Sequence, residues 1–213
     1  FVRIVSGTFR RNTNYLHLRL NRKLKFASPT AFMAQKKSIV DEMFPGDIVG
    51  LHDTGNFKIG DTITEGEIMS YKGIPSFSPE LFKYVENDSP LKAKQLAKGI
   101  DQLMDEGVAQ LFIGKHTGRK IIGTVGALQF EVIQYRLEHE YGAKCRFEHI
   151  TLYKTTWFKS TNKAQLKDFR ARKANQIAID KEGREVFLAD SQFALQMAQQ
   201  KYTDIEFYFT SEF

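Results

Sequence analysis

The chain lacks the features of a disulfide-bonded or membrane-spanning protein. Its only cysteine is Cys145, so no internal disulfide can form, and we expect a cytoplasmic protein. No apolar run approaches the roughly 18 residues that a membrane helix needs, so we expect no membrane partner. The chain does have 213 residues that are 42% hydrophobic, which is enough for two compact domains of a soluble protein.

Acidic residues are also missing from the start of the chain, where none precedes Asp41. This stretch carries a first basic cluster, which includes Arg10, Arg11, Arg19, Arg22, Lys23, Lys25, Lys36 and Lys37. A second cluster, interrupted only by Asp168, consists of Lys154, Lys159, Lys163, Lys167, Arg170, Arg172 and Lys173. One such cluster is ordinarily a solvated face. Two positively charged clusters favour a nucleic-acid partner, because its phosphates bind lysine and arginine. The net charge of the chain, +6, points the same way.

Residues 1–66 consist of short alternating runs separated by turn residues, a pattern typical of a small β barrel. Within residues 15–20, leucines alternate with polar or aromatic residues such as Tyr15 and His17, so the two sets should face opposite sides of a strand. Phe1 already lies in a strand-like run. We therefore expect the chain to be a fragment and the barrel to lack its first strand.

The pattern changes across residues 67–79 to helices that alternate with strands. Gly107 and Gly142 are expected to end the two helices, and Ser89 is expected to cap the first. In chain order we expect a strand at 81–85, a helix after Ser89, strands at 108–113 and 119–125, a helix at 127–141 and a strand at 144–152. This βαββαβ order is typical of ferredoxin-like folds.

Residues 154–213 repeat the same order of elements. We expect a strand at 155–159, a helix at 163–173, two strands around the turn 181–184, a helix at 191–202 and a strand at 205–209. The predicted fold class is a β barrel domain followed by an α+β domain with ferredoxin-like organisation. The α+β part, residues 67–213, is either one enlarged domain or two packed ferredoxin-like units, 67–153 and 154–213; the sequence leaves both open.

Several motifs resemble those of the translational GTPases. Phe44–Leu51, which contains Gly-Asp-Ile-Val, and the later Gly60-Asp61-Thr62 are similar to the second-domain barrel of that superfamily. Gly123–Val132 resembles the strand, turn and helix of the third domain in the translocase-like branch. Its Leu128-Gln129-Phe130 has the form found in peptide chain release factor 3. Two further segments resemble that family in particular: Gly73–Phe82 and Pro90–Gly99.

The resemblance covers nearly the whole chain but not the GTP-binding domain of the family. A phosphate-binding loop needs G-x-x-x-x-G-K-[ST], and the nearest string, Gly114-Lys115-His116-Thr117, has histidine where a magnesium-binding hydroxyl must stand. The guanine-reading Asn-Lys-x-Asp is also missing. We therefore expect no enzyme activity and no cofactor in these residues, with GTP or GDP and magnesium held by another domain of the parent protein.

The resemblance implies a role in translation termination. The parent GTPase would bind the ribosome after peptide release and promote the departure of class I release factors. This monomeric part would dock on small-subunit RNA and protein and relay the nucleotide state. For ribosomal RNA we predict Arg10, Arg11, Arg22, Lys23, Lys36 and Lys37, with a second set formed by Lys163, Lys167, Arg170 and Lys173. The alternatives are an elongation-factor-G or ribosomal-protection type GTPase, a free-standing RNA-binding module and a metabolic enzyme.

Three other features invite a functional interpretation. The glycines of Gly123-x-x-Gly126 can hold a phosphate, but a tight turn that needs glycine explains them better. Cys145 and His149 are about 13 Å apart on one strand, too far to share a metal. Trp157, the only tryptophan, is interpreted as a core residue, with a partner-binding anchor as the alternative.

Overall fold

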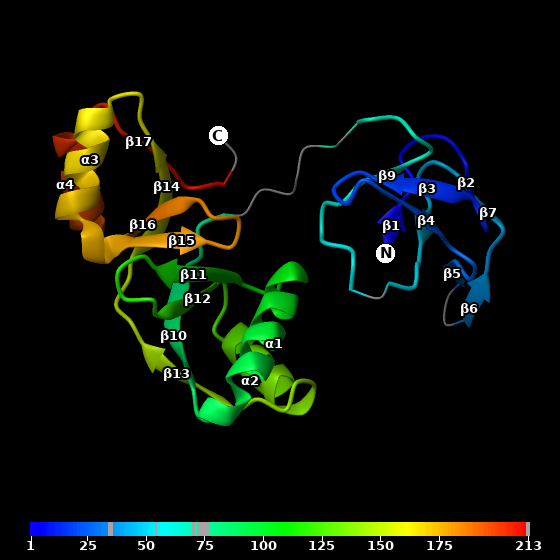
Figure 1. Ribbon diagram of the computed structural model, residues 1–213, viewed down its shortest axis with the longest axis horizontal. Helices are drawn as coiled ribbons and strands as arrows, with labels where there is room; N and C mark the ends of the chain where they lie inside the picture. Colours follow the sequence, from blue (N-terminus) through cyan, green and yellow to red (C-terminus); the bar gives the residue numbers. More distant parts are fainter. Residues whose placement is uncertain (34–35, 54, 70, 72–76, 212–213) are drawn as a thin grey trace. The chain divides into compact units, whose positions relative to one another are not determined.

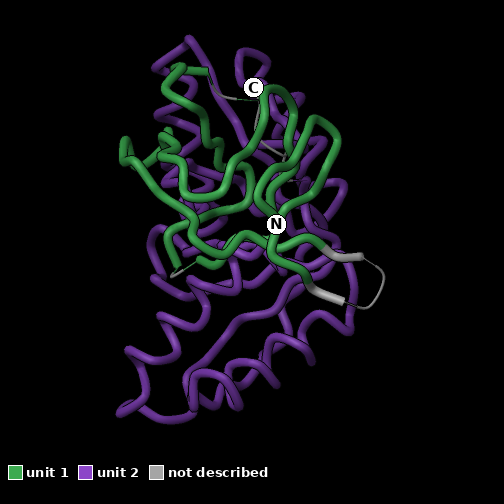
Figure 2. The backbone as a smooth tube through the Cα atoms, turned by 90° about the vertical axis from the view of Figure 1, so that its right-hand side faces the viewer, with its two compact units in different colours: residues 1–74 green, residues 75–213 purple. Residues whose placement is uncertain are grey.

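The computed structural model describes residues 1–33, 36–53, 55–69, 71 and 77–211, with their side chains except those of residues 32, 33, 36 and 37. The chain divides into two compact units, Phe1–Ile74 (unit 1) and Pro75–Phe213 (unit 2) (Figure 2). The division falls in the stretch where the sequence pattern changes. None of the described helices is long and apolar enough to cross a membrane.

Unit 1 is built from short antiparallel ladders (Figure 1). Its strands are β1 (Val2–Arg3), β2 (Phe9–Arg10), β3 (Asn14–His17), β4 (Arg22–Lys25), β5 (Thr30–Met33), β6 (Lys36–Ile39), β7 (Glu42–Met43), β8 (Ile48–Val49) and β9 (Ile63–Thr64). β1 pairs with β8, β2 with β7 and β5 with β6, while β3 lies between β4 and β9. Among the described residues the ladders do not join into a closed barrel. The unit is therefore β-rich, and its closure into a barrel stays a prediction.

The core of unit 1 is formed by aromatic rings. Phe9 stacks on Tyr15 with ring centroids 5.0 Å apart, and Phe26 packs against both. Tyr15 and His17 belong to the buried face of β3, being 4% and 0% exposed, whereas the leucine that follows at position 20 is 37% exposed. Alternation separates the two faces of a strand, but the stacked rings decide which face is inside.

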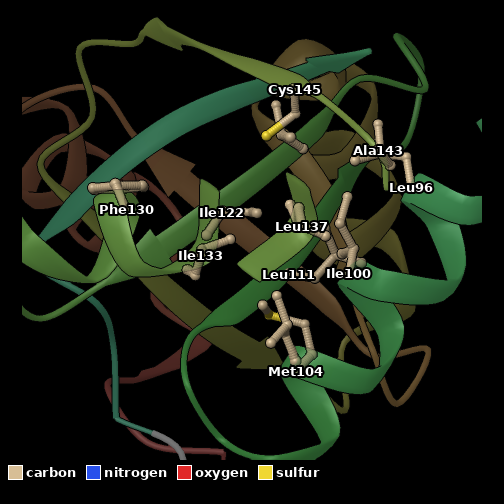
Figure 3. Packing of buried hydrophobic residues seen from close by; sticks show 12 residues of the cluster. Leu96, Ile100, Met104, Leu111, Ile122, Phe130, Ile133, Leu137, Ala143 and Cys145 are labelled. Atoms are coloured by element: carbon tan, nitrogen blue, oxygen red, sulfur yellow. The ribbon is translucent and has the colours of Figure 1, made fainter. Parts of the chain in front are cut away.

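The first half of unit 2 has the element order that the sequence predicts. It comprises β10 (Leu81–Asn87), a 3₁₀ turn (Pro90–Lys92), α1 (Ala93–Asp105), β11 (Gln110–Gly114), β12 (Lys120–Thr124), α2 (Leu128–His139) and β13 (Cys145–His149). Leu96, Ile100 and Leu103 are buried on one side of α1, as their spacing predicts, and belong to one cluster with residues of α2. Figure 3 shows Ile100 of α1 and Leu137 of α2 within this cluster. Ser89 occupies the cap position but makes no capping hydrogen bond, because a 3₁₀ turn begins at Pro90 before the α-helix.

The second half repeats this order. It comprises β14 (Lys154–Lys159), α3 (Lys163–Arg172), a second 3₁₀ turn (Ala174–Gln176), β15 (Ile177–Asp180), β16 (Glu185–Ala189), α4 (Gln192–Lys201) and β17 (Glu206–Tyr208). Asn162 and Ser191 cap the two helices through their side-chain oxygens. Phe169 of α3 is fully buried in the core that α3 and α4 form with the strands of this half.

The two halves share one eight-stranded antiparallel sheet in the order β13-β10-β12-β11-β15-β16-β14-β17. They meet where β11 pairs with β15, and Ile113 lies opposite Ile179. Leu111 and Ile113 point to one face of β11, and Ile177 and Ile179 to the same face of β15. Because Leu111 packs with α1 and α2 and Ile177 packs with α3 and α4, all four helices cover one face of the sheet.

The helix-free face of the sheet is also buried. Phe82 of β10 and Trp157 of β14 belong to one cluster, although four strands separate them in the sheet. The backbone N–H of Thr155 donates to Ser78 Oγ at 3.1 Å, and the Ser78 N–H donates to the carbonyl of Phe209 at 2.8 Å. The sheet therefore curls until the segment before β10 reaches β14 and the end of the chain.

Candidate nucleic-acid interface

The first two predicted RNA-binding residues have partners within unit 1. Arg10 Nε lies 3.1 Å from a carboxylate oxygen of Glu42, the residue opposite it in the β2–β7 ladder. Arg11 Nε donates to the carbonyl of Ala27 at 2.7 Å, and its Nη1 lies 3.4 Å from Asp41. These pairs neutralise part of the positive charge, so both arginines are weaker candidates than their exposure alone indicates.

Strand β4 presents cations that have no partner among the described residues. Arg22, Lys23 and Lys25 are all exposed. Because side chains alternate along a strand, Lys23 and Lys25 point to the same face about 7 Å apart, while Leu24 between them packs on the core. Lys25 was not among the predicted residues. Its position two residues after Lys23, on the outward face of an alternating strand, is the signal that identifies it.

The remaining predicted residues have different surroundings. Lys36 and Lys37 lie in β6, and their side chains are outside the described part of the structure. Lys163 and Lys167 on α3 are exposed and have no partner among the described residues. Arg170 is paired, with Nη2 2.6 Å from Glu185, and Lys173 Nζ lies 5.8 Å from the centre of the Phe187 ring. The structure does not merge the two predicted sets into one site, because each lies in a different unit.

The Gly60-Asp61-Thr62 turn has a structural explanation. The Asp61 side chain is only 6% exposed, and its carboxylate accepts two hydrogen bonds from Arg19, at 2.6 and 2.7 Å, and one from the Lys58 amide at 2.7 Å. The Nε2 atom of His17, which is fully buried, lies 3.0 Å from the same carboxylate without forming a directed hydrogen bond. Asp61 thus ties the turn after β3 to the turn before β9.

The glycine segment before α2 does not form a phosphate site. The amides of Val125 and Gly126 both donate to Gln129 Oε1, at 2.9 and 3.0 Å, so neither is available to an anion. Gly123 lies in β12 rather than in a tight turn, and a side chain there would come within 2.5 Å of Pro79. Close packing, not turn geometry, therefore requires this glycine. The central residue of Leu128-Gln129-Phe130 thus lies in the first turn of α2 and holds the two amides that precede the helix.

We expect Gln129→Ala to lower the unfolding free energy of unit 2 by about 2 kcal/mol, because two backbone amides lose their acceptor and the Val108 carbonyl loses its donor. Urea unfolding followed by tryptophan fluorescence measures this, since the only tryptophan lies in unit 2. Gln95→Ala, on the exposed side of α1, is the control and should change stability by less than about 0.5 kcal/mol. Equal effects of the two substitutions would contradict the role of Gln129 in holding the segment before α2.

The other chemical candidates are packing residues. Trp157 is 1% exposed and donates from Nε1 to Asp180 at 2.8 Å, so it is a core residue and not a surface anchor. Burial raises the pKa of the Cys145 thiol to about 11, which keeps it protonated and unreactive near neutral pH. Within the described part of the chain, no three metal-ligating side chains gather into a cluster.

Comparisons with known proteins relate both units to translation factors. Residues 71–199 match the family described as "Class II release factor RF3, C-terminal domain", and residues 1–66 match "Elongation factor G domain 2". A crystal structure of a protein from Thermus thermophilus has a similar fold, with a TM-score of 0.56 at 16% identity. The similarity covers 74% of this chain and 26% of that protein, so the chain spans about a quarter of its length.

Proposed function

This chain belongs to the class II release factor RF3 family, whose C-terminal domain it contains at residues 71–199, and from that membership we propose a role in translation termination. The chain docks a GTPase on the ribosome and relays its nucleotide state, so that class I release factors leave after the peptide is released. It acts in the cytoplasm as a monomer. The family match carries this proposal.

The elongation-factor-G match at residues 1–66 supports a docking role for unit 1. We propose that this unit forms the barrel predicted from its sequence and holds small-subunit RNA through the cations of β4. Arg22, Lys23 and Lys25 are exposed and unpaired within the described residues, so binding a phosphate breaks no ion pair. Arg10 and Arg11 would first have to leave Glu42 and Asp41.

Nucleotide chemistry is proposed for a domain outside these residues. The 213 residues contain neither the phosphate-loop motif nor Asn-Lys-x-Asp, so GTP or GDP and magnesium would bind elsewhere in the parent protein. Unit 2, with its two βαββαβ halves in one sheet, then serves as the rigid element between the nucleotide domain and the ribosome. A difference of a few kcal/mol in ribosome affinity between nucleotide states is enough for such a switch.

Sedimentation with whole ribosomes and isolated small subunits tests the docking role. We expect Lys23→Glu/Lys25→Glu to lower the affinity at least tenfold at ~100 mM salt and to reduce the slope of log K against log salt by about 2. Lys94→Glu/Lys98→Glu is the control: these α1 lysines are exposed, have no partner among the described residues and give the same change in charge. Wild-type protein that binds neither particle, or equal losses in both variants, would contradict docking through β4.

A further inference from the structure

Three cations of the second predicted set lie along one side of α3, and the fourth, Lys173, is the residue at which the helix ends. Lys163, Lys167 and Arg170 follow each other at steps of four and three residues, which places them in a row. The helix has 10 residues and is about 15 Å long. Its acidic residue, Asp168, lies on another side, where it pairs with Arg172 at 2.9 Å and accepts a hydrogen bond from Tyr202.

A fifth cation reaches this row from the other half of unit 2. Lys115 lies in the turn between β11 and β12, and its amide donates to the Ile177 carbonyl at 2.9 Å. Its Nζ lies 2.5 Å from one carboxylate oxygen of Glu185, while Arg170 Nη2 lies 2.6 Å from the other. The junction of the two halves therefore places Lys115 beside Arg170. We call Lys115, Lys163, Lys167, Arg170 and Lys173 the basic ridge.

Glu185 orders the ridge without neutralising it. Its side chain is 17% exposed and shared by two cations. Burial alone raises the pKa of Glu185, but hydrogen bonds from Lys115 and Arg170 outweigh it and leave the pKa below its usual range. The carboxylate stays charged at neutral pH and fixes the two cations in place. Lys163 and Lys167 are exposed and lack a partner among the described residues, so the ridge keeps a surplus of positive charge.

We propose that the basic ridge binds the phosphate backbone of double-stranded RNA. None of the large hydrophobic side chains exposed in the described structure lies on α3 or in the turn after β11. A protein partner would need such anchors, and single-stranded RNA would need exposed rings for base stacking. Duplex RNA is recognised mainly by shape and backbone contacts, for which a straight row of cations suffices. This site lies in unit 2 and goes beyond the proposed docking of unit 1.

Fluorescence anisotropy with a blunt-ended RNA duplex of about 16 base pairs tests this assignment. Lys163→Glu/Lys167→Glu should lower the affinity at least tenfold and reduce the slope of log K against log salt by about 1.5 to 2. Lys163→Gln/Lys167→Gln should give a smaller loss in the same direction. Lys94→Glu/Lys98→Glu, with the same charge change and spacing on α1, should stay within threefold of the wild type. Circular dichroism confirms folding in each case.

Three results would overturn the proposal: no binding of the duplex by the wild-type chain, equal losses for the α1 and α3 variants, or tighter binding of a polyglutamate peptide than of the duplex. The test is separable from that of the proposed function. Loss of duplex binding in the α3 variant, with ribosome binding insensitive to Lys23→Glu/Lys25→Glu, would leave the ridge standing and refute docking through β4. Unchanged duplex binding in the α3 variant, with ribosome binding weakened by Lys23→Glu/Lys25→Glu, would refute only the ridge.

Discussion

Asp61→Ala should lower the unfolding free energy of unit 1 by about 3 kcal/mol. The substitution strips Arg19 and the Lys58 amide of their acceptor and leaves the buried His17 ring beside an apolar methyl group. Removing one partner of a buried ion pair typically costs about 3–5 kcal/mol, and the lower end applies because Arg19 is 38% exposed. Asp61→Asn should cost less, since an amide oxygen can still accept one of these hydrogen bonds.

Hydrogen exchange read by mass spectrometry suits this measurement, because it assigns lost protection to peptides of unit 1. Asp41→Ala is the control: its carboxylate is 84% exposed and contacts Arg11 only at 3.4 Å, so stability should change by less than about 0.5 kcal/mol. A loss below about 1 kcal/mol for Asp61→Ala would show that the cluster around Asp61 does not support the fold.

The same carboxylate predicts how unit 1 responds to acid. Burial on its own raises the pKa of Asp61, but hydrogen bonds from Arg19 and the Lys58 amide, with the charges of Arg19 and His17, outweigh it and hold the pKa below its usual range. A group whose pKa is lower in the folded state stabilises the fold above its unfolded pKa and loses that contribution as pH falls through the folded value. Protection of unit 1 should therefore decline below about pH 4 in the wild type and less steeply in Asp61→Ala.

Periodicity and stop signals in the sequence were sufficient to predict the elements of unit 2. The helix predicted at 163–173 is α3, Lys163–Arg172, and Gly107 follows the first helix with a φ of 72°, as expected of a glycine stop. Which strands pair with each other was harder to predict from the sequence. Pairing of β11 with β15 joins residues that lie far apart in the chain, and no local pattern encodes it.

The candidate site illustrates the same limit. Charge runs in the sequence located both sets of cations, but not which of them are already paired. Arg170 and Lys163 look alike in the sequence, yet only Arg170 meets Glu185, a residue from β16. In the sequence, Lys115 stands out only as part of Gly114-Lys115-His116-Thr117, which does not complete a phosphate-loop motif. It joins the basic ridge because the sheet brings its turn beside α3, which is a consequence of tertiary structure.

Asp180→Ala should have the largest effect on unit 2, a loss of about 3–5 kcal/mol. Its side chain is 5% exposed on the helix-free face of the sheet. One oxygen accepts from Trp157 Nε1 and Arg184 Nε, both at 2.8 Å, and the other accepts from the amides of Glu182 and Arg184. Alanine leaves the indole N–H of Trp157 without an acceptor in an apolar cluster, and the turn that follows β15 loses the acceptor of its two amides and of Arg184 Nε. An unsatisfied buried donor costs more than a single hydrogen bond contributes.

A double-mutant cycle isolates the contribution of the indole. Trp157→Phe alone should cost about 1–2 kcal/mol, because Asp180 keeps its other donors while the smaller ring packs less completely. In the Asp180→Ala background the same change should cost less, since the indole N–H is then unpaired, and the coupling should exceed about 0.5 kcal/mol. Urea unfolding followed by circular dichroism measures all four proteins, with Asp101→Ala as the control, because that side chain is exposed and has no partner among the described residues. Strict additivity would mean that Asp180 stabilises unit 2 through Arg184 and the turn amides, independently of the buried tryptophan.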